Sequence, residues 1–133
     1  MNRADVDHWL QAYISAWKSY DPNEIGDLFA DDVEYRYHPY DEPIRSRDAV
    51  VASWLGESSA AGTSTRDEPG TYDASYETVA VDGDVAVAVG TSSYSDVPGG
   101  PTIRVYDNCY VIRFDSAGRC REFTEWYMQR RNA

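Results

Sequence analysis

Three side chains of types that move protons are spread along this chain: Tyr13, His38 and Glu125. A histidine titrates near neutral pH, and a carboxyl removed from water has a raised pKa that suits a general base. A buried phenol needs a hydrogen-bond partner and can stabilise negative charge that develops on an oxygen. Each residue also has a plainer interpretation: a core tyrosine, a solvated histidine at the rim of a strand, and an exposed strand glutamate.

Tyrosine is unusually frequent in this chain. Its 133 residues include 11 tyrosines, beside 4 tryptophans and 3 phenylalanines. A fold of this size does not need so many phenols to fill a core, so we expect some of them to face a cavity. Aromatic rings with polar groups are typical of small-molecule pockets.

Charge and motifs narrow the function classes. The net charge of −11 disfavours nucleic acids and anionic membranes as partners. No apolar run reaches the roughly 18 residues of a membrane span, and the first 20 residues lack a signal-peptide core, so we expect a cytoplasmic protein. Nucleotide-binding, serine-hydrolase and metal-binding motifs are missing, so we expect no cofactor and no metal.

Apolar spacing predicts helices before strands. Spacings of three and four residues indicate helices at 5–20, 22–30 and 46–56, and alternation indicates strands at 33–38, 71–81, 84–95, 102–114 and 119–129. Asp21 and Ser46 are suited to cap the second and third helices, and Asp31-Asp32 to end the second. Residues 56–70 are predicted to form a mobile loop. The layout is that of a single α+β domain of long antiparallel strands.

The last hairpin predicts which side chains share one face. A symmetric turn at 115–118 pairs Asn108 with Glu125, Tyr110 with Phe123, and Tyr106 with Tyr127. In the same register Cys109 pairs with Thr124 and Cys120 with Arg113. The two cysteines are then too far apart for a disulfide, and we expect inert thiols.

Several segments together resemble one family. They are the opening helix with Trp17, LFADDVEY at 28–35, SRDAV at 46–50 and RCREFTEWY at 119–127. In this order they are similar to the SnoaL-like branch of the nuclear transport factor 2-like superfamily. The resemblance implies a cone-shaped, curved antiparallel sheet wrapped around three N-terminal helices, with a deep pocket. The family includes ketosteroid isomerases, epoxide hydrolases, dehydratases, polyketide cyclases and non-catalytic domains, so fold alone leaves the function open.

The resemblance to ketosteroid isomerase implies roles for three positions. Tyr13 matches a tyrosine that donates to the developing oxyanion. His38 stands where the isomerase has its proton-moving aspartate, and Tyr110 where it has a protonated aspartate as second donor. The base and the second donor therefore both differ from that enzyme.

The resemblance to limonene-type epoxide hydrolase implies a second set. Tyr35 matches a tyrosine that positions the attacking water, Tyr37 replaces an asparagine, and Glu125 replaces an aspartate. The residues that protonate the epoxide there correspond to Val89 and Thr91, which cannot carry out that step. The catalytic residues of neither enzyme can therefore be assigned unchanged to this chain.

These observations predict a small-molecule pocket. We expect Glu125, Tyr13 and His38 to be catalytic, and the ligand to contact Trp17, Tyr35, Tyr37, Val89, Thr91, Tyr106, Asn108, Tyr110, Phe123 and Tyr127. The ligand would be small, largely apolar and oxygen-bearing, and the chemistry cofactor-free acid–base work. The alternative is a non-catalytic ligand-binding or dimerisation domain. Val105, Cys109 and Val111, on the outer sheet face, favour a homodimer.

Overall fold

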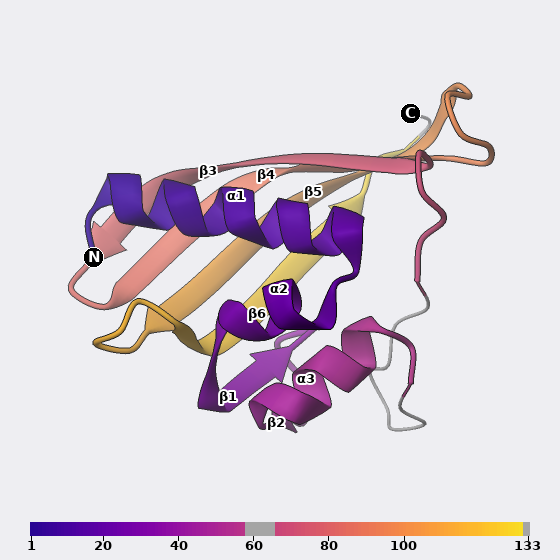
Figure 1. Ribbon diagram of the computed structural model, residues 1–133. Helices are drawn as coiled ribbons and strands as arrows, with labels where there is room; N and C mark the ends of the chain where they lie inside the picture. Colours follow the sequence, from indigo (N-terminus) through magenta and orange to yellow (C-terminus); the bar gives the residue numbers. More distant parts are fainter. Residues whose placement is uncertain (58–65, 132–133) are drawn as a thin grey trace.

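The computed structural model of the chain, which describes residues 1–57 and 66–131, contains one curled sheet with helices on one face (Figure 1). The elements are α1 (Arg3–Ser19), α2 (Pro22–Asp27), β1 (Phe29–Arg36), β2 (Ile44–Arg45), α3 (Arg47–Trp54), β3 (Tyr72–Asp82), β4 (Val85–Ser95), β5 (Thr102–Phe114) and β6 (Cys120–Gln129). The strand order is β2-β1-β6-β5-β4-β3. The predicted α+β architecture is confirmed, with one correction: the sheet is mixed, because β1 runs parallel to β6.

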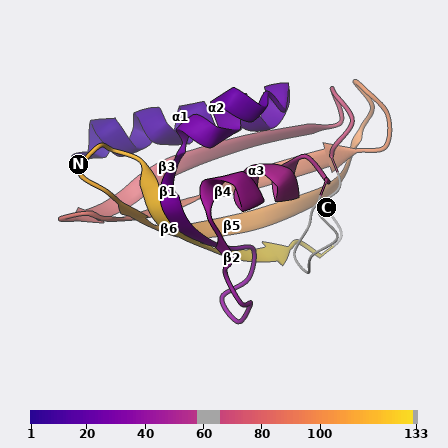
Figure 2. The ribbon, with the colours of Figure 1, turned by 60° about the horizontal axis from the view of Figure 1, so that its bottom comes forward.

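The helices all lie on the concave side of the sheet, as the second view shows (Figure 2). Helix α1 crosses β3 and its neighbours, while α2 and α3 lie nearer β1. Helix α1 begins two residues before the predicted start, because Asn2 and Asp5 form a capping box. None of the helices in the described ranges is both long and apolar enough to span a membrane.

The second helix is shorter than predicted. Helix α2 is capped by Asp21, as expected, but it ends at Asp27 instead of residue 30. Strand β1 begins at Phe29 instead of residue 33 because the backbone already pairs there: the Cys120 N–H donates to the Leu28 carbonyl over 2.9 Å. Asp31-Asp32, predicted to end the helix, therefore lies inside β1.

Helix α3 follows the prediction at its start. The Ser46 hydroxyl accepts a hydrogen bond from the Ala49 N–H, and the helix ends at Trp54. Gly56 has a φ of 71°, the left-handed conformation that commonly follows a helix. The short strand β2 was not predicted. Most of the predicted loop at 56–70 falls on residues 58–65, outside the described residues.

The predicted register of the β5–β6 hairpin is wrong by two residues. Asn108 pairs with Tyr127 and Tyr110 with Glu125, where Glu125 and Phe123 were predicted, and Tyr106 pairs with Gln129. Because side chains alternate with a period of two, this shift leaves every predicted side chain on its predicted face.

The cause of the shift lies at the turn. The Asp115 N–H donates to the Arg119 carbonyl, and an irregularity follows, so that Phe114 pairs with Cys120 while Arg113 pairs with Glu122. Each feature moves the pairing by one residue relative to the symmetric turn that we assumed.

The two cysteines consequently have other neighbours than predicted. Cys109 pairs with Trp126, not Thr124, and Cys120 with Phe114, not Arg113. Both thiols are free. Burial raises the pKa of the Cys120 thiol well above its ordinary value, which keeps it protonated and unreactive.

Candidate active site

A cavity of about 320 Å³ lies between the helices and the concave face of the sheet. Its walls are mostly aromatic and are formed by Tyr13, Trp17, Tyr20, Tyr35, Tyr37, Trp54, Asp67, Tyr76, Ser92, Tyr94, Arg104, Tyr106, Asn108, Tyr110, Glu125 and Tyr127. Nine of these were predicted for the site: Tyr13, Trp17, Tyr35, Tyr37, Tyr106, Asn108, Tyr110, Glu125 and Tyr127. The structure brings these nine together around one space.

A chain of two hydrogen bonds holds the carboxyl of Glu125. The Asn108 amide nitrogen donates to Glu125 Oε2 over 2.9 Å, and the Ser92 hydroxyl donates to Asn108 Oδ1 over 3.0 Å. Because an ionised carboxyl only accepts hydrogen bonds, the amide nitrogen faces Glu125, and the amide oxygen accepts from the Ser92 hydroxyl. Three neighbouring strands thereby orient one carboxyl toward the cavity.

Removal from water dominates the electrostatics of Glu125. It raises the pKa of this carboxyl from 4.5 to about 7, and the hydrogen bond from Asn108 opposes the shift without cancelling it. No cation lies within ion-pair distance of Glu125 in the described part of the chain. Near neutral pH the group is therefore present in both protonation states, which suits proton transfer.

Buried phenols surround this carboxyl. Tyr13, Tyr35 and Tyr110 are less than 8% exposed, and burial raises the pKa of each well above 10. The negative charge of Glu125 adds to the shift in all three. These hydroxyls consequently stay protonated across the physiological range and act as hydrogen-bond donors.

Packing fixes where these phenols lie. The Tyr13 ring stacks on Phe123 at 5.7 Å and meets Trp54 edge-on at 5.1 Å. The Tyr110 ring lies 4.9 Å from both Phe123 and Tyr76. The donors are thus held by the core, and a ligand does not have to order them.

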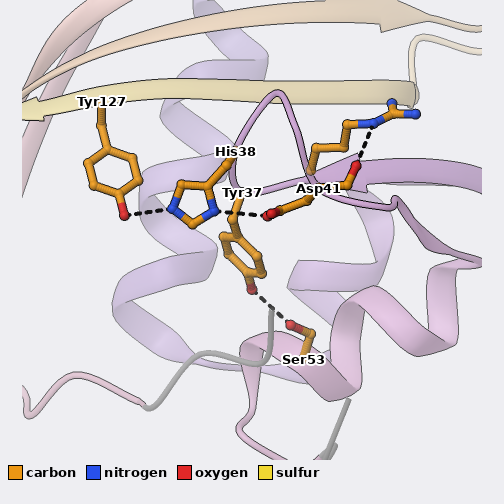
Figure 3. Close-up of polar contacts among 6 residues, drawn as sticks. Tyr37, His38, Asp41, Ser53 and Tyr127 are labelled. Atoms are coloured by element: carbon orange, nitrogen blue, oxygen red, sulfur yellow. Dashed lines mark hydrogen bonds and ion pairs between the residues drawn. The ribbon is translucent and has the colours of Figure 1, made fainter. Parts of the chain in front are cut away.

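His38 does not line the cavity but an adjoining groove at its rim. There it lies between Asp41 and Tyr127 (Figure 3). Its Nδ1 is 2.8 Å from Asp41 Oδ2, and its Nε2 is 2.8 Å from the Tyr127 hydroxyl. Tyr127 lines both the cavity and a groove on the outer surface. Both nitrogens of His38 are therefore occupied, and the one that faces the cavity side is hydrogen-bonded to Tyr127, a residue of the cavity wall.

Tyr37 is held from the opposite side. Its hydroxyl shares a hydrogen bond of 2.9 Å with Ser53 of α3 (Figure 3). This contact ties the segment after β1 to the helix and fixes Tyr37 as a wall residue.

Three predicted contact residues do not line the cavity. Val89 and Thr91 were placed there by resemblance, yet they alternate along β4 with Ala88 and Ser92, which face inward, so they lie on the outer face. Phe123 is fully buried beneath the cavity and is part of the core that supports it.

Other wall residues were not predicted. Tyr76, Ser92 and Tyr94 belong to β3 and β4, and strand alternation alone would have found them had Ala86 and Ala88 been taken as the inward positions. A polar network at the mouth was missed as well: the Trp17 Nε1 donates to Asp67 over 3.1 Å. Burial raises the pKa of Asp67.

Within the described ranges, no group of three or more His, Cys, Asp or Glu side chains is arranged to hold a metal ion. The residues that line the cavity carry hydroxyls, the indole N–H groups of Trp17 and Trp54, one amide, two carboxyls and the guanidinium of Arg104. Arg104 lies over the Tyr94 ring, 5.0 Å from its centroid. Together these groups can donate and accept protons and hydrogen bonds.

The fold and this aromatic cavity define a SnoaL-like protein of the nuclear transport factor 2-like class. Residues 10–123 match the SnoaL-like domain, which is most of the chain, so the chain belongs to that family. None of the curated proteins compared with it matches.

Solved structures show the same fold. The chain is similar to an LEH-like epoxide hydrolase of M. tuberculosis (15% identity, TM-score 0.62, covering 95% of this chain and 84% of that one). It is also similar to a proposed ketosteroid isomerase of Kribbella flavida DSM 17836 (14%, 0.67, 98% and 83%). A third is an NTF-2-like protein of unknown function from Burkholderia xenovorans LB400 (18%, 0.65, 98% and 88%). At these identities the likeness concerns the fold alone.

Proposed function

We propose that the protein binds a small, oxygen-bearing ring compound in the aromatic cavity and transforms it by cofactor-free acid–base chemistry. One observation carries this proposal: Glu125 is a carboxyl with a pKa raised to about 7, directed into a cavity whose walls are lined by protonated phenols. Related folds are described as an epoxide hydrolase and a proposed ketosteroid isomerase, which supports the reaction class.

Glu125 acts as the base in this proposal. Its ionised form takes a proton from a carbon next to a carbonyl or from a water molecule, and its protonated form returns a proton later in the cycle. Asn108 stabilises the ionised form and holds the carboxyl in position. His38 is not the direct base in this proposal, because its ring nitrogens contact Asp41 and the Tyr127 hydroxyl and it does not line the cavity.

The buried phenols act on the oxygen of the ligand. Tyr13 and Tyr110 remain protonated beside Glu125, so they donate hydrogen bonds as negative charge moves onto that oxygen. Because the rings are locked by core packing, little reorganisation accompanies the reaction. The aromatic walls favour a ring-bearing ligand over a lipid chain.

A nitrobenzisoxazole probe tests this proposal without knowledge of the natural substrate. A base removes the C–H proton of its isoxazole ring, the N–O bond breaks and a nitrile forms. The ring oxygen becomes the phenolate of the same product molecule, which is coloured. We expect the wild-type rate to rise with pH through about 7, because only the ionised carboxyl is a base. Glu125→Gln should lower the rate by about 100-fold or more.

Two further variants complete the test. Tyr13→Phe should slow the reaction because one donor to the phenolate is lost, whereas Glu77→Gln, on the exposed side of β3, should leave it unchanged. Equal rates for wild type and Glu125→Gln would remove Glu125 as the base. Binding of the probe without turnover would favour the non-catalytic alternative.

The homodimer remains a prediction. Val105, Cys109 and Val111 are partly exposed and alternate along β5 with Asn108 and Tyr110, which line the cavity. They therefore lie on the sheet face that the helices leave uncovered (Figure 2). Trp126, which pairs with Cys109, is 45% exposed on that face. Light scattering should give twice the mass of the chain, and a monomer at all concentrations would contradict the prediction.

A further inference from the structure

We propose that Asp41, His38 and Tyr127 form a proton relay at the rim, in which Tyr127 is a second proton-transfer group of the cavity. The inference rests on the proposed function, because acid–base catalysis by Glu125 calls for a second group that exchanges protons with the ligand. It assigns a new role to Tyr127, the catalytic residue of the relay, and makes His38 and Asp41 positioning residues.

Geometry fixes the tautomer of His38. Its Nδ1 faces the Asp41 carboxylate, which only accepts hydrogen bonds, so Nδ1 carries the ring proton (Figure 3). In neutral His38 the Nε2 is then an acceptor, and the Tyr127 hydroxyl must donate to it over 2.8 Å. The three groups therefore form one directed chain of donors, in which the phenol donates to the imidazole and the imidazole donates to the carboxylate.

Local backbone structure holds this chain in place. The Asp41 N–H donates to the His38 carbonyl over 3.1 Å, which closes a turn and brings the carboxylate back to its own histidine. The Arg36 Nε donates to the Asp41 carbonyl over 3.3 Å and ties the turn to β1. These two hydrogen bonds hold the turn that carries Asp41 next to His38 and β1.

The relay moves a proton in balanced steps. A proton released by a bound ligand passes to the Tyr127 oxygen while the Tyr127 proton passes to His38 Nε2. The imidazole becomes an imidazolium, paired with the Asp41 carboxylate, and gives a proton to water, since its side chain is 34% exposed. The reverse sequence delivers a proton to the ligand.

Protonation of His38 also changes what Tyr127 can donate to. The imidazolium carries its own proton on Nε2 and donates to the Tyr127 oxygen, which frees the phenolic hydrogen for a ligand. Among the described residues, the other charged or ionisable side chains next to the relay are Arg36, which donates to the Asp41 carbonyl, Tyr40, whose ring stacks on His38 at 5.2 Å, and Tyr106, whose ring lies 5.6 Å from that of Tyr127. Asp107 and Glu125 line the same outer groove. Glu125 must therefore be neutralised in any pH test.

Tyr40 and Tyr127 form a matched pair for the experiment. Their rings lie 5.2 and 5.3 Å from the imidazole and both side chains are exposed, but only the Tyr127 hydroxyl reaches Nε2. Tyr127→Phe thus removes the relay, and Tyr40→Phe removes a hydroxyl without it. The chain has two histidines, so His8→Gln leaves a single imidazole signal.

The first measurement is ¹⁵N NMR of histidine with ¹³Cζ-labelled tyrosine. We expect neutral His38 as the Nδ1–H tautomer and a Tyr127 signal that titrates together with His38. Asp41→Asn should weaken the preference for the Nδ1–H tautomer, because an amide can also donate to Nδ1, and the Tyr127 signal should change with it. The Nε2–H tautomer, or a Tyr127 signal independent of His38, would overturn the relay.

The second measurement is binding of acetylnaphthalene, an aryl ketone that only accepts hydrogen bonds, in the Glu125→Gln background. We expect binding to tighten by about threefold to tenfold as His38 becomes charged. Tyr127→Phe should abolish this dependence and Tyr40→Phe should keep it; equal dependence in both would overturn the relay. If the ketone does not bind at any pH, the proposed binding function fails, while the NMR measurement still decides the relay.

Discussion

The two ends of the concave sheet face differ sharply although the same strands form both. At one end Ala86, Ala88, Ile112 and Phe114 are essentially inaccessible to solvent. At the other end the same strands present Ser92 and Asn108, hydrogen-bonded to each other. Polarity thus rises along β4 and β5 toward the mouth of the cavity.

Strand β6 shows the change over a single step of two residues. Phe123 has no exposed surface and stacks on Tyr35 with ring centroids 4.6 Å apart. Glu125, the next residue on that face, carries a carboxyl whose charged form is disfavoured by its surroundings. The dry end supplies the stability that allows the fold to carry a poorly solvated carboxyl at the other end.

The largest effect is expected at the dry end. Phe123→Ala removes a ring that packs against Trp9, Tyr13, Tyr35 and Tyr110. The free energy of unfolding should fall by about 3–5 kcal/mol, the usual result of a large cavity in a core. Urea denaturation measures this loss; a loss below about 1 kcal/mol would contradict the assignment of Phe123 to the core.

A smaller effect of opposite sign is expected at the polar end. The folded-state pKa of Glu125 is raised to about 7 from 4.5, so the folded protein binds a proton that the unfolded chain releases. Wild type should lose up to about 3 kcal/mol of stability as the pH rises through this window, relative to Glu125→Gln. The variant should therefore be the more stable protein at about pH 8.

Denaturation curves at a series of pH values check this difference. Glu77→Gln removes an exposed carboxyl and controls for the general effect of reducing the negative charge. The prediction would be contradicted if the free energies of unfolding of both variants differed from that of wild type by the same amount at every pH.

A third variant tests the boundary between the two ends. Gly90 follows Ala88 on the inward side of β4, and a Cβ placed there would lie 2.6 Å from the Tyr76 ring and 2.7 Å from the Tyr76 Cα. Gly90→Ala should lower the free energy of unfolding by about 1–3 kcal/mol and displace Tyr76, a wall residue. Thermal melts and a loss of probe binding would show this; unchanged melting and binding would contradict the close approach.

Much of the sheet could be predicted because a register error of two residues does not change the face on which a side chain lies. The hairpin register was wrong by two residues, yet Asn108, Tyr110 and Glu125 still face one cavity. A shift of one residue would have sent them to the outer face. The helix caps at Asp21 and Ser46 could likewise be predicted, because each is formed by hydrogen bonds between residues close in the sequence.

Features that depend on long-range contacts could not be predicted. Strand β1 begins early because it pairs with β6, far away in the sequence, which overrides a local preference for helix at 28–30. Val89 and Thr91 were placed by resemblance and not by the alternation of β4. The contact between His38 and Tyr127 joins residues from two distant segments, and no local pattern indicates it.

Direct titration of Glu125 tests the central claim. ¹³C NMR of the side-chain carboxyl, assigned by its disappearance in Glu125→Gln, reports the protonation of this one group among 23 acidic residues. Removal of the Glu125 carboxyl from water, which the hydrogen bond from Asn108 opposes only in part, predicts a midpoint near 7. A midpoint near 4.5, the value of an ordinary exposed glutamate, would contradict the account of Glu125 as a proton-moving group in an aromatic cavity.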